Sequence, residues 1–100
     1  MRTFNSVDEL AALKGQPIGN SEWMTITQEA VNLFADATGD HQWIHVDPER
    51  AANGPFGTTI AHGYMTLALL PRLMHQIYSV DGIKLAINYG LNKVRFPAPV

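Results

Sequence analysis

The most apolar helical segment of the chain, YMTLALLPRLMHQIYSV at residues 64–80, limits the fold more than any other feature. Its apolar residues continue over several helical turns, which predicts a core helix against which the rest of the chain packs. Pro71 lies inside this segment. Because a proline ring removes a backbone donor and crowds the preceding turn, at a cost of about 3 kcal/mol, we expect the helix to be kinked or divided there.

The composition predicts one globular domain over residues 1–100. Apolar residues make up 46% of the chain and charged residues 16%, which does not fit a disordered or purely electrostatic binder. A domain of this length buries roughly two thirds of the surface that its unfolded chain exposes. The chain has no cysteine, which excludes a disulfide framework, a thiolate nucleophile and a zinc–thiolate site.

Capping signals place two shorter helices before the core helix. Ser6 and Glu9 have the spacing of a capping box, which predicts a helix over about residues 7–13. The segment QEAVNLFADAT at residues 28–38 has apolar residues at helical spacing, Thr25 or Thr27 before it as a possible cap, and Gly39 after it. We expect a helix there, with the glycine as its left-handed end.

Two segments have the alternating pattern of β-strands. They are SEWMTIT at residues 21–27 and IKLAINYGLNKVRF at residues 83–96, the latter interrupted by Gly90. A pair of strands without further sheet is marginal in water. We therefore expect that strands continue beyond Val100 or that a partner chain supplies them.

Charge and hydropathy exclude two classes of partner. The formal charge is −2, and the seven lysines and arginines are scattered without a cluster, so no nucleic-acid partner is expected. Asp8 and Glu9 stand where a signal peptide would need its apolar region, and the apolar run at residues 64–70 is too short to cross a bilayer. We expect a cytoplasmic protein with no membrane partner.

The stretch ATGDHQWIHVDPERAA, at residues 37–52, gathers polar side chains in a mostly apolar chain. Asp40 and His45 are close enough along it for a turn to bring carboxylate and imidazole together, which makes an acid–base pair. An imidazole exchanges protons near neutral pH, and a base must reach its proton within about 3 Å. The alternative is structural, with Asp40 capping a local turn and His45 making an internal hydrogen bond.

Metal binding is a rival interpretation of the same stretch. His41 and His45 have the i,i+4 spacing of helical zinc ligands, and Asp40 and Asp47 could add oxygens. However, Gln42 replaces the glutamate of the H-E-x-x-H arrangement, and no distal ligand set is evident. Asp47 directly precedes a proline and is better explained as the N-cap of a short helix. We expect neither a metal nor a cofactor.

A second polar site, IAHGYM at residues 60–65, directly precedes the core helix. If Gly63 occupies the first helical turn, its backbone can approach a ligand closely and its N–H suits an anionic oxygen. Alternatively, Gly63 only permits tight packing and His62 is a satisfied, partly buried histidine. His75, inside the core helix, is expected to be structural, and a place in the core or a pocket wall is the default for Trp23, Trp43 and Tyr64.

The two polar stretches together resemble the MaoC-like dehydratase family, which includes R-specific enoyl-CoA hydratases and nodulation-protein-N-like members. That family has a G-D-x-N-P-[LIV]-H pattern, then an Asp-Pro helix start, then an A-H-G step into a long helix. The resemblance covers about residues 20–100, with Gln42 and Trp43 departing from the pattern. The matching residues are Gly39, Asp40, Ile44, His45, Asp47, Pro48, Ala61, His62 and Gly63.

This resemblance implies an α+β hot-dog fold, in which an antiparallel sheet wraps around a long central helix. The present chain would lack the C-terminal strands of that sheet. The resemblance also implies a homodimer, because hot-dog sheets commonly join edge to edge.

The activity implied by the resemblance is reversible, R-specific hydration of a trans-2-enoyl thioester without a metal. Asp40 and His45 would hold and deprotonate a water molecule, and the N–H of Gly63 would stabilise the enolate-like oxygen. The substrate would be an acyl-CoA or acyl-carrier-protein thioester, bound with help from Trp43, His62 and Tyr64. Two alternatives stay open, a thioesterase and a non-catalytic acyl-thioester-binding protein, because one fold serves several functions.

Overall fold

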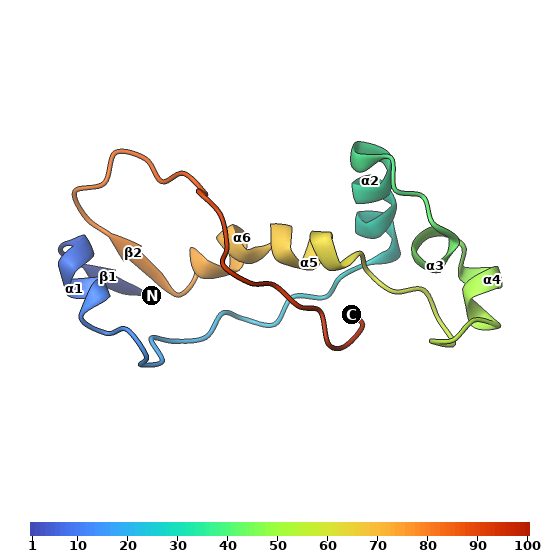
Figure 1. The fold of residues 1–100 in the computed structure, drawn as a ribbon, viewed down its shortest axis with the longest axis horizontal. Coiled ribbons are helices and arrows are strands. Elements are labelled where there is room, and N and C mark those ends of the chain that lie inside the picture. The colour runs from blue at the N-terminus through green and yellow to red at the C-terminus, as the bar shows by residue number, and fades with distance from the viewer. The chain divides into compact units, whose positions relative to one another are not determined.

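A computed structural model describes all residues from 1 to 100 (Figure 1). The chain combines short helices with a small sheet, so the α+β class is confirmed. It forms two compact units, Met1–Trp23 with Leu70–Val94 and Met24–Leu69 with Arg95–Val100. The elements are, in order, β1 (Arg2–Phe4), α1 (Val7–Ala11), α2 (Gln28–Thr38), α3 (Trp43–Val46), α4 (Pro48–Ala52), α5 (Gly63–Ala68), α6 (Leu70–Met74) and β2 (Tyr78–Val80).

The first unit is organised by pairing of the strands β1 and β2, which lie side by side in Figure 1. They run parallel, with Phe4 opposite Val80. Phe4 is buried, and its ring meets that of Tyr78 edge to face at 6.0 Å between centroids. This contact gives the strand pair an apolar anchor, since aromatic cross-strand neighbours stabilise a pleated surface.

The first helix of this unit, α1, begins with the predicted capping box. Ser6 Oγ accepts a hydrogen bond from the Glu9 N–H at 3.2 Å, and the Glu9 carboxylate accepts one from the Asn5 N–H at 2.8 Å. The helix ends at Ala11, slightly earlier than expected, and turns continue to Gly15. At Gly15 the backbone has a φ of 84°, a left-handed value that glycine adopts without a steric penalty.

The predicted core helix is divided, as Pro71 led us to expect. Its first part is α5 and its second part is α6, in which Pro71 is the second residue. Proline is tolerated in the first turn of a helix because the N–H that it lacks has no intrahelical acceptor there. The prediction was wrong for residues 78–80, which form β2, because pairing with β1 outweighs the local helical pattern.

The two predicted strands, at residues 21–27 and 83–96, are not strands in this structure. An alternating pattern produces a strand only where a second backbone is available to pair with it. The sheet that forms is a single parallel pair, and an antiparallel sheet wrapped around a long helix is not formed by these elements. The hot-dog arrangement therefore stays a prediction.

The second unit is built on α2, whose predicted caps are confirmed. Thr27 Oγ1 accepts a hydrogen bond from the Ala30 N–H at 3.1 Å, and Gly39 ends the helix with a φ of 80°. The N-cap role of Asp47 is also confirmed, because its carboxylate accepts the Arg50 N–H at 3.1 Å at the start of α4. The loop between α2 and α4 is thus held at both ends by local hydrogen bonds.

A small apolar cluster packs α2 against the segment that leads into α5. Val31 of α2, Ala61 and Met65 of α5 are its buried members, and Phe34 packs against them. This packing sets the position of residues 60–62 relative to α2. No helix in the chain combines the length and the hydropathy that crossing a bilayer would require.

Candidate active site

Three polar side chains from separate segments of the second unit come together. Asp40 follows α2, His45 belongs to α3, and His62 is the residue before α5. One carboxylate oxygen of Asp40 and one ring nitrogen of each histidine all lie within 4.8 Å of one another. We refer to these residues as the Asp40–His45–His62 cluster.

His45 is buried, with 6% of its surface exposed, and its proton position follows from its hydrogen bond. Nδ1 lies 2.8 Å from the carbonyl oxygen of Ile60. Because a carbonyl oxygen only accepts, the hydrogen must be on Nδ1. In the neutral ring the other nitrogen, Nε2, then keeps its lone pair and can take a proton. The backbone at Ile60 therefore selects the tautomer that a general base needs.

His62 is buried even more deeply, with 2% exposed, and it holds the opposite tautomer. Its Nε2–H donates to the backbone carbonyl of Asp40 at 2.9 Å, while its Nδ1 has no partner within the protein. The ring stacks on that of His45, with centroids 3.8 Å apart and planes inclined by 22°. His62 thus holds the Asp40 main chain and supports the His45 ring, and little of its surface is left for a ligand.

The side chain of Asp40 is half exposed, and its two oxygens differ in their surroundings. Oδ1 accepts the Gln42 N–H at 3.3 Å, which is the local turn contact considered from the sequence. Oδ2 lies 4.0 Å from His62 Nε2. Two groups bound to one water at about 2.8 Å each lie roughly 4.5 Å apart. The spacing within the cluster therefore suits one shared water molecule.

The geometry does not favour a metal site built on His41 and His45. His41 precedes α3 and its Nε2 lies 2.9 Å from the Asp36 carboxylate on α2. That hydrogen bond raises the pKa of His41 above 6.5. In the cluster itself, the two imidazole planes are nearly parallel, so their lone pairs do not converge on the point, about 2 Å from each nitrogen, that zinc needs.

Gly63 is the first residue of α5, and its N–H has no acceptor within the helix. A Cβ atom added here would lie 2.6 Å from the ring of Phe96, so only glycine fits beneath that ring. Tyr64, with 74% exposed, meets the same ring edge to face at 6.1 Å between centroids. Gly63 and the Phe96 ring line one cavity.

Trp43 packs on α4 and on the turn that follows it. The Arg50 guanidinium lies 4.4 Å from the centre of its ring, and a Cβ added at Gly54 would be 2.9 Å from the ring edge. The remaining aromatic and imidazole side chains singled out in the sequence, Trp23 and His75, are exposed in the first unit. The expectation that Trp23 packs in a core or pocket was wrong, because residues 21–27 form no sheet that would cover it.

One residue beside the cluster was missed from the sequence. Gln28, at the start of α2, donates from Nε2 to the carbonyl oxygen of His45 at 2.7 Å. Nothing in the local pattern distinguishes this glutamine from an ordinary first-turn residue, and the contact spans 17 positions in sequence.

A carboxylate and an imidazole brought this close together have the chemistry that acid–base catalysis requires. The family model described as "MaoC like domain" matches residues 9–100, and the chain belongs to this family.

Curated relatives agree with this assignment. The chain is 81% identical over 100 residues to 3-hydroxyacyl-thioester dehydratase Z of Mycobacterium tuberculosis, covering 100% of this chain and 66% of that protein. It is 49% identical over 102 residues to nodulation protein N of Rhizobium meliloti, covering 95% and 60%. It is 46% identical over 49 residues to 3-hydroxybutyryl-CoA dehydratase of Methylorubrum extorquens, covering 49% and 31%. The chain therefore spans just under two thirds of the length of the first of these relatives.

Proposed function

We propose that this protein is an enoyl-thioester hydratase, a hydro-lyase that adds water reversibly to a trans-2-enoyl thioester. The observation that carries the proposal is the proximity of His45 and Asp40: a ring nitrogen of His45 lies within 4.8 Å of an Asp40 carboxylate oxygen, and the hydrogen bond from His45 Nδ1–H to Ile60 leaves Nε2 to act as the proton acceptor. Two of the relatives have names that describe dehydration of 3-hydroxyacyl thioesters, the reverse direction of the same reaction.

In the proposed mechanism, Asp40 and His45 hold the water through hydrogen bonds. His45 Nε2 takes one proton from the water as its oxygen bonds to C3 of the substrate. The electron pair of the C2–C3 double bond moves towards C2 and the thioester carbonyl. The cluster then returns a proton to C2, so that H and OH have been added and the site regains its starting protonation. Such acid–base groups typically contribute about 100-fold or more.

The oxygen of the thioester carbonyl becomes negative during this step. We assign its stabilisation to the N–H of Gly63, which follows His62 directly and is free of an intrahelical acceptor. A single donor of this kind is typically worth about 3 kcal/mol. Tyr64 and Trp43 are proposed to contact the acyl or carrier part of the substrate. His62 is proposed to act from behind the site, through its hydrogen bond to Asp40.

The same proposal covers the fold, the cellular location, the oligomeric state and the product. We propose that the chain is part of a hot-dog domain, that it acts in the cytoplasm, that it forms a homodimer, and that its product is the R-3-hydroxyacyl thioester. Membership in the MaoC-like family supports the fold, and the dehydratase relatives support the product class. The carrier is proposed to be CoA or acyl carrier protein.

The test is a hydration assay with crotonyl-CoA, followed by loss of absorbance at the enoyl-thioester band. We expect turnover with no release of free thiol, and chiral analysis should find the R product. Release of thiol without loss of the double bond would identify a thioesterase instead. Saturable binding of crotonyl-CoA with no conversion would identify a non-catalytic binding protein. Either result would refute the hydratase assignment.

A further inference from the structure

We propose that Gln28 is a positioning residue for His45. Its side-chain amide connects the main chain at His45 to the segment whose carbonyl fixes the His45 tautomer. This inference rests on the proposed function, since it concerns the base of that reaction. The contacts themselves are independent of which reaction the site performs.

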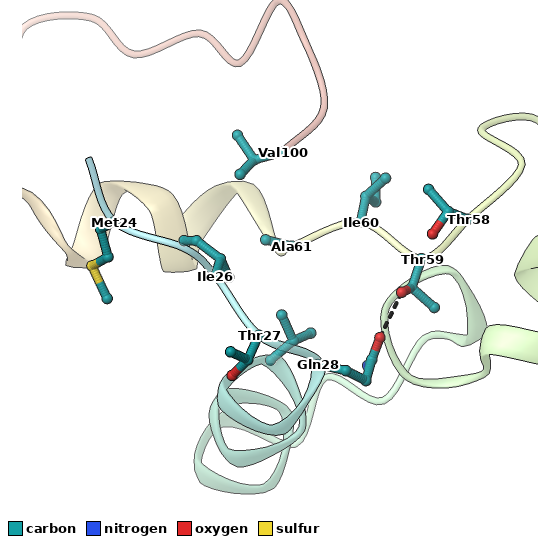
Figure 2. A pocket seen from close by; sticks show the side chains of 10 residues that line it. Met24, Ile26, Thr27, Gln28, Thr58, Thr59, Ile60, Ala61 and Val100 are labelled. Carbon is teal, nitrogen blue, oxygen red and sulfur yellow. Dashed lines mark hydrogen bonds between the residues drawn. The ribbon is translucent and has the colours of Figure 1, made fainter.

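Gln28 makes hydrogen bonds with both ends of its amide. Nε2 donates to the His45 carbonyl at 2.7 Å, and Oε1 accepts from the Thr59 hydroxyl at 2.5 Å. Figure 2 shows the second of these bonds as a dashed line, reaching from the start of α2 to the segment before Ala61. The amide therefore adds a side-chain link between α3 and the 59–61 segment, which lie far apart in sequence.

The 59–61 segment is the one that orients His45. Thr59 directly precedes Ile60, whose carbonyl accepts the His45 Nδ1–H at 2.8 Å. The Ile60 N–H in turn donates to the Ile44 carbonyl at 3.0 Å. Gln28 thus closes a cycle of hydrogen bonds. Each bond in the cycle holds either the main chain beside His45 or the segment that carries the Ile60 carbonyl, which is the acceptor of the His45 side chain. If this cycle of hydrogen bonds is broken, the Ile60 carbonyl that selects the His45 tautomer is free to move.

The orientation of the Gln28 amide is fixed by its partners. Nε2 also donates to Asn32 Oδ1 at 2.9 Å, one helical turn further along α2. The His45 carbonyl can only accept, and the Thr59 hydroxyl donates to the opposite end. A flipped amide would place two acceptors against each other at His45. Only an amide, with a donor and an acceptor on one carbon, satisfies both neighbours.

This requirement makes Gln28→Glu the informative substitution. A carboxylate has the same shape and can accept from Thr59, but it cannot donate to the His45 carbonyl. We expect kcat for crotonyl-CoA to fall by up to about 100-fold, the loss typical of a reacting group displaced by roughly 1 Å, with KM little changed. Thr59→Val, which replaces the hydroxyl with a methyl group, should lower kcat less and in the same way. Gln16→Glu is the matched control, because Gln16 is exposed in the first unit.

The readout specific to positioning is the His45 ring in a long-range proton–nitrogen NMR spectrum of the ¹⁵N-labelled protein. The wild type should show the form protonated at Nδ1, and Gln28→Glu and Thr59→Val should shift its nitrogen signals towards a mixture of tautomers. The signals are assigned by their loss in His45→Ala. Gln16→Glu should match the wild type in both measurements.

The results separate this proposal from the proposed function. A wild type without hydratase activity refutes the function, while the ring spectra still decide the role of Gln28. An active wild type with unchanged kcat and unchanged ring signals in both variants would overturn the positioning role. A raised KM with unchanged kcat and ring signals would also overturn it, because Gln28 would then contact substrate in the cavity of about 340 Å³ that it lines. If Gln28→Glu does not fold, Thr59→Val decides alone.

Discussion

Two neighbouring histidines hold different tautomers because different ring nitrogens meet a carbonyl. His45 gives its Nδ1–H to Ile60 and keeps the lone pair of Nε2. His62 gives its Nε2–H to Asp40 and keeps the lone pair of Nδ1, which is buried without a partner. A proton acceptor must be reachable by substrate, which favours His45 over His62 as the proposed base.

At the residue scale, we predict that Asp40→Asn and His45→Ala each lower crotonyl-CoA hydration by at least about 100-fold. The amide of Asn cannot carry the negative charge that holds the water and assists proton transfer, and Ala removes the base itself. Initial rates at the enoyl-thioester band measure the effect. His41→Ala is the matched control, because His41 is exposed and pairs with Asp36 outside the cluster. Near-normal turnover in both site variants would rule out this assignment.

A second residue-scale prediction concerns the pKa of His41. Its hydrogen bond to Asp36 raises that pKa above 6.5, so the folded state binds the proton more tightly than the unfolded state. The resulting stabilisation is fully present below the unfolded value and is lost as pH rises through the folded value. We expect Asp36→Asn to lower the His41 pKa, measured by NMR titration of the ring protons. An unchanged titration would show that Asp36 is not the cause.

At the scale of elements, the sequence predicted the helices whose capping residues lie within or beside the helical segment itself. The helix α2 has its threonine cap and its glycine end within the segment itself, and α4 has Asp47 and a proline at its start. The segments at 21–27 and 83–96 have strand patterns, but a strand depends on a distant partner that no local pattern specifies. The same dependence explains β2, which forms only because β1 lies beside it.

In the site too, local contacts could be predicted from the sequence and distant ones could not. Asp40 and His45 could be paired from the sequence because one short loop joins them. The contact between His62 and the Asp40 carbonyl spans 22 positions. The sequence marked IAHGYM as a second polar site, but only the family resemblance connected it to Asp40 and His45. Gln28 had no such signal, since its role depends on how α2 packs against the 59–61 segment.

The start of α5 gives a prediction at the element scale. Gly63→Ala should lower hydratase activity and destabilise the fold by about 1–3 kcal/mol, because the added methyl group overlaps the Phe96 ring. Urea unfolding measures the stability change. In a Phe96→Ala background the same substitution should cost less, since the obstructing ring is gone. Equal costs in both backgrounds would show that Phe96 does not explain the need for glycine.

At the scale of the whole molecule, the cluster and all its supporting contacts belong to one compact unit. Gln28, Asp40, His45, Thr59 and His62 all lie within Met24–Leu69. The other unit contributes no side chain to these hydrogen bonds. Its 83–91 segment instead presents large apolar side chains to solvent: Ile83, Leu85, Ile87, Tyr89 and Leu91.

That apolar segment is a candidate surface for the homodimer that the family resemblance implies. Leu85, Ile87 and Tyr89 are 67%, 79% and 105% exposed, and apolar rows of this kind are normally covered by association. We expect light scattering after size exclusion to give twice the chain mass for the wild type. Ile87→Lys should shift the protein to a single-chain mass, because a charge in the row would have to be desolvated on association. Asn88→Lys adds the same charge to a neighbouring exposed position and should leave the dimer intact. A wild type at the single-chain mass, or a dimer unaffected by Ile87→Lys, would contradict association through this segment.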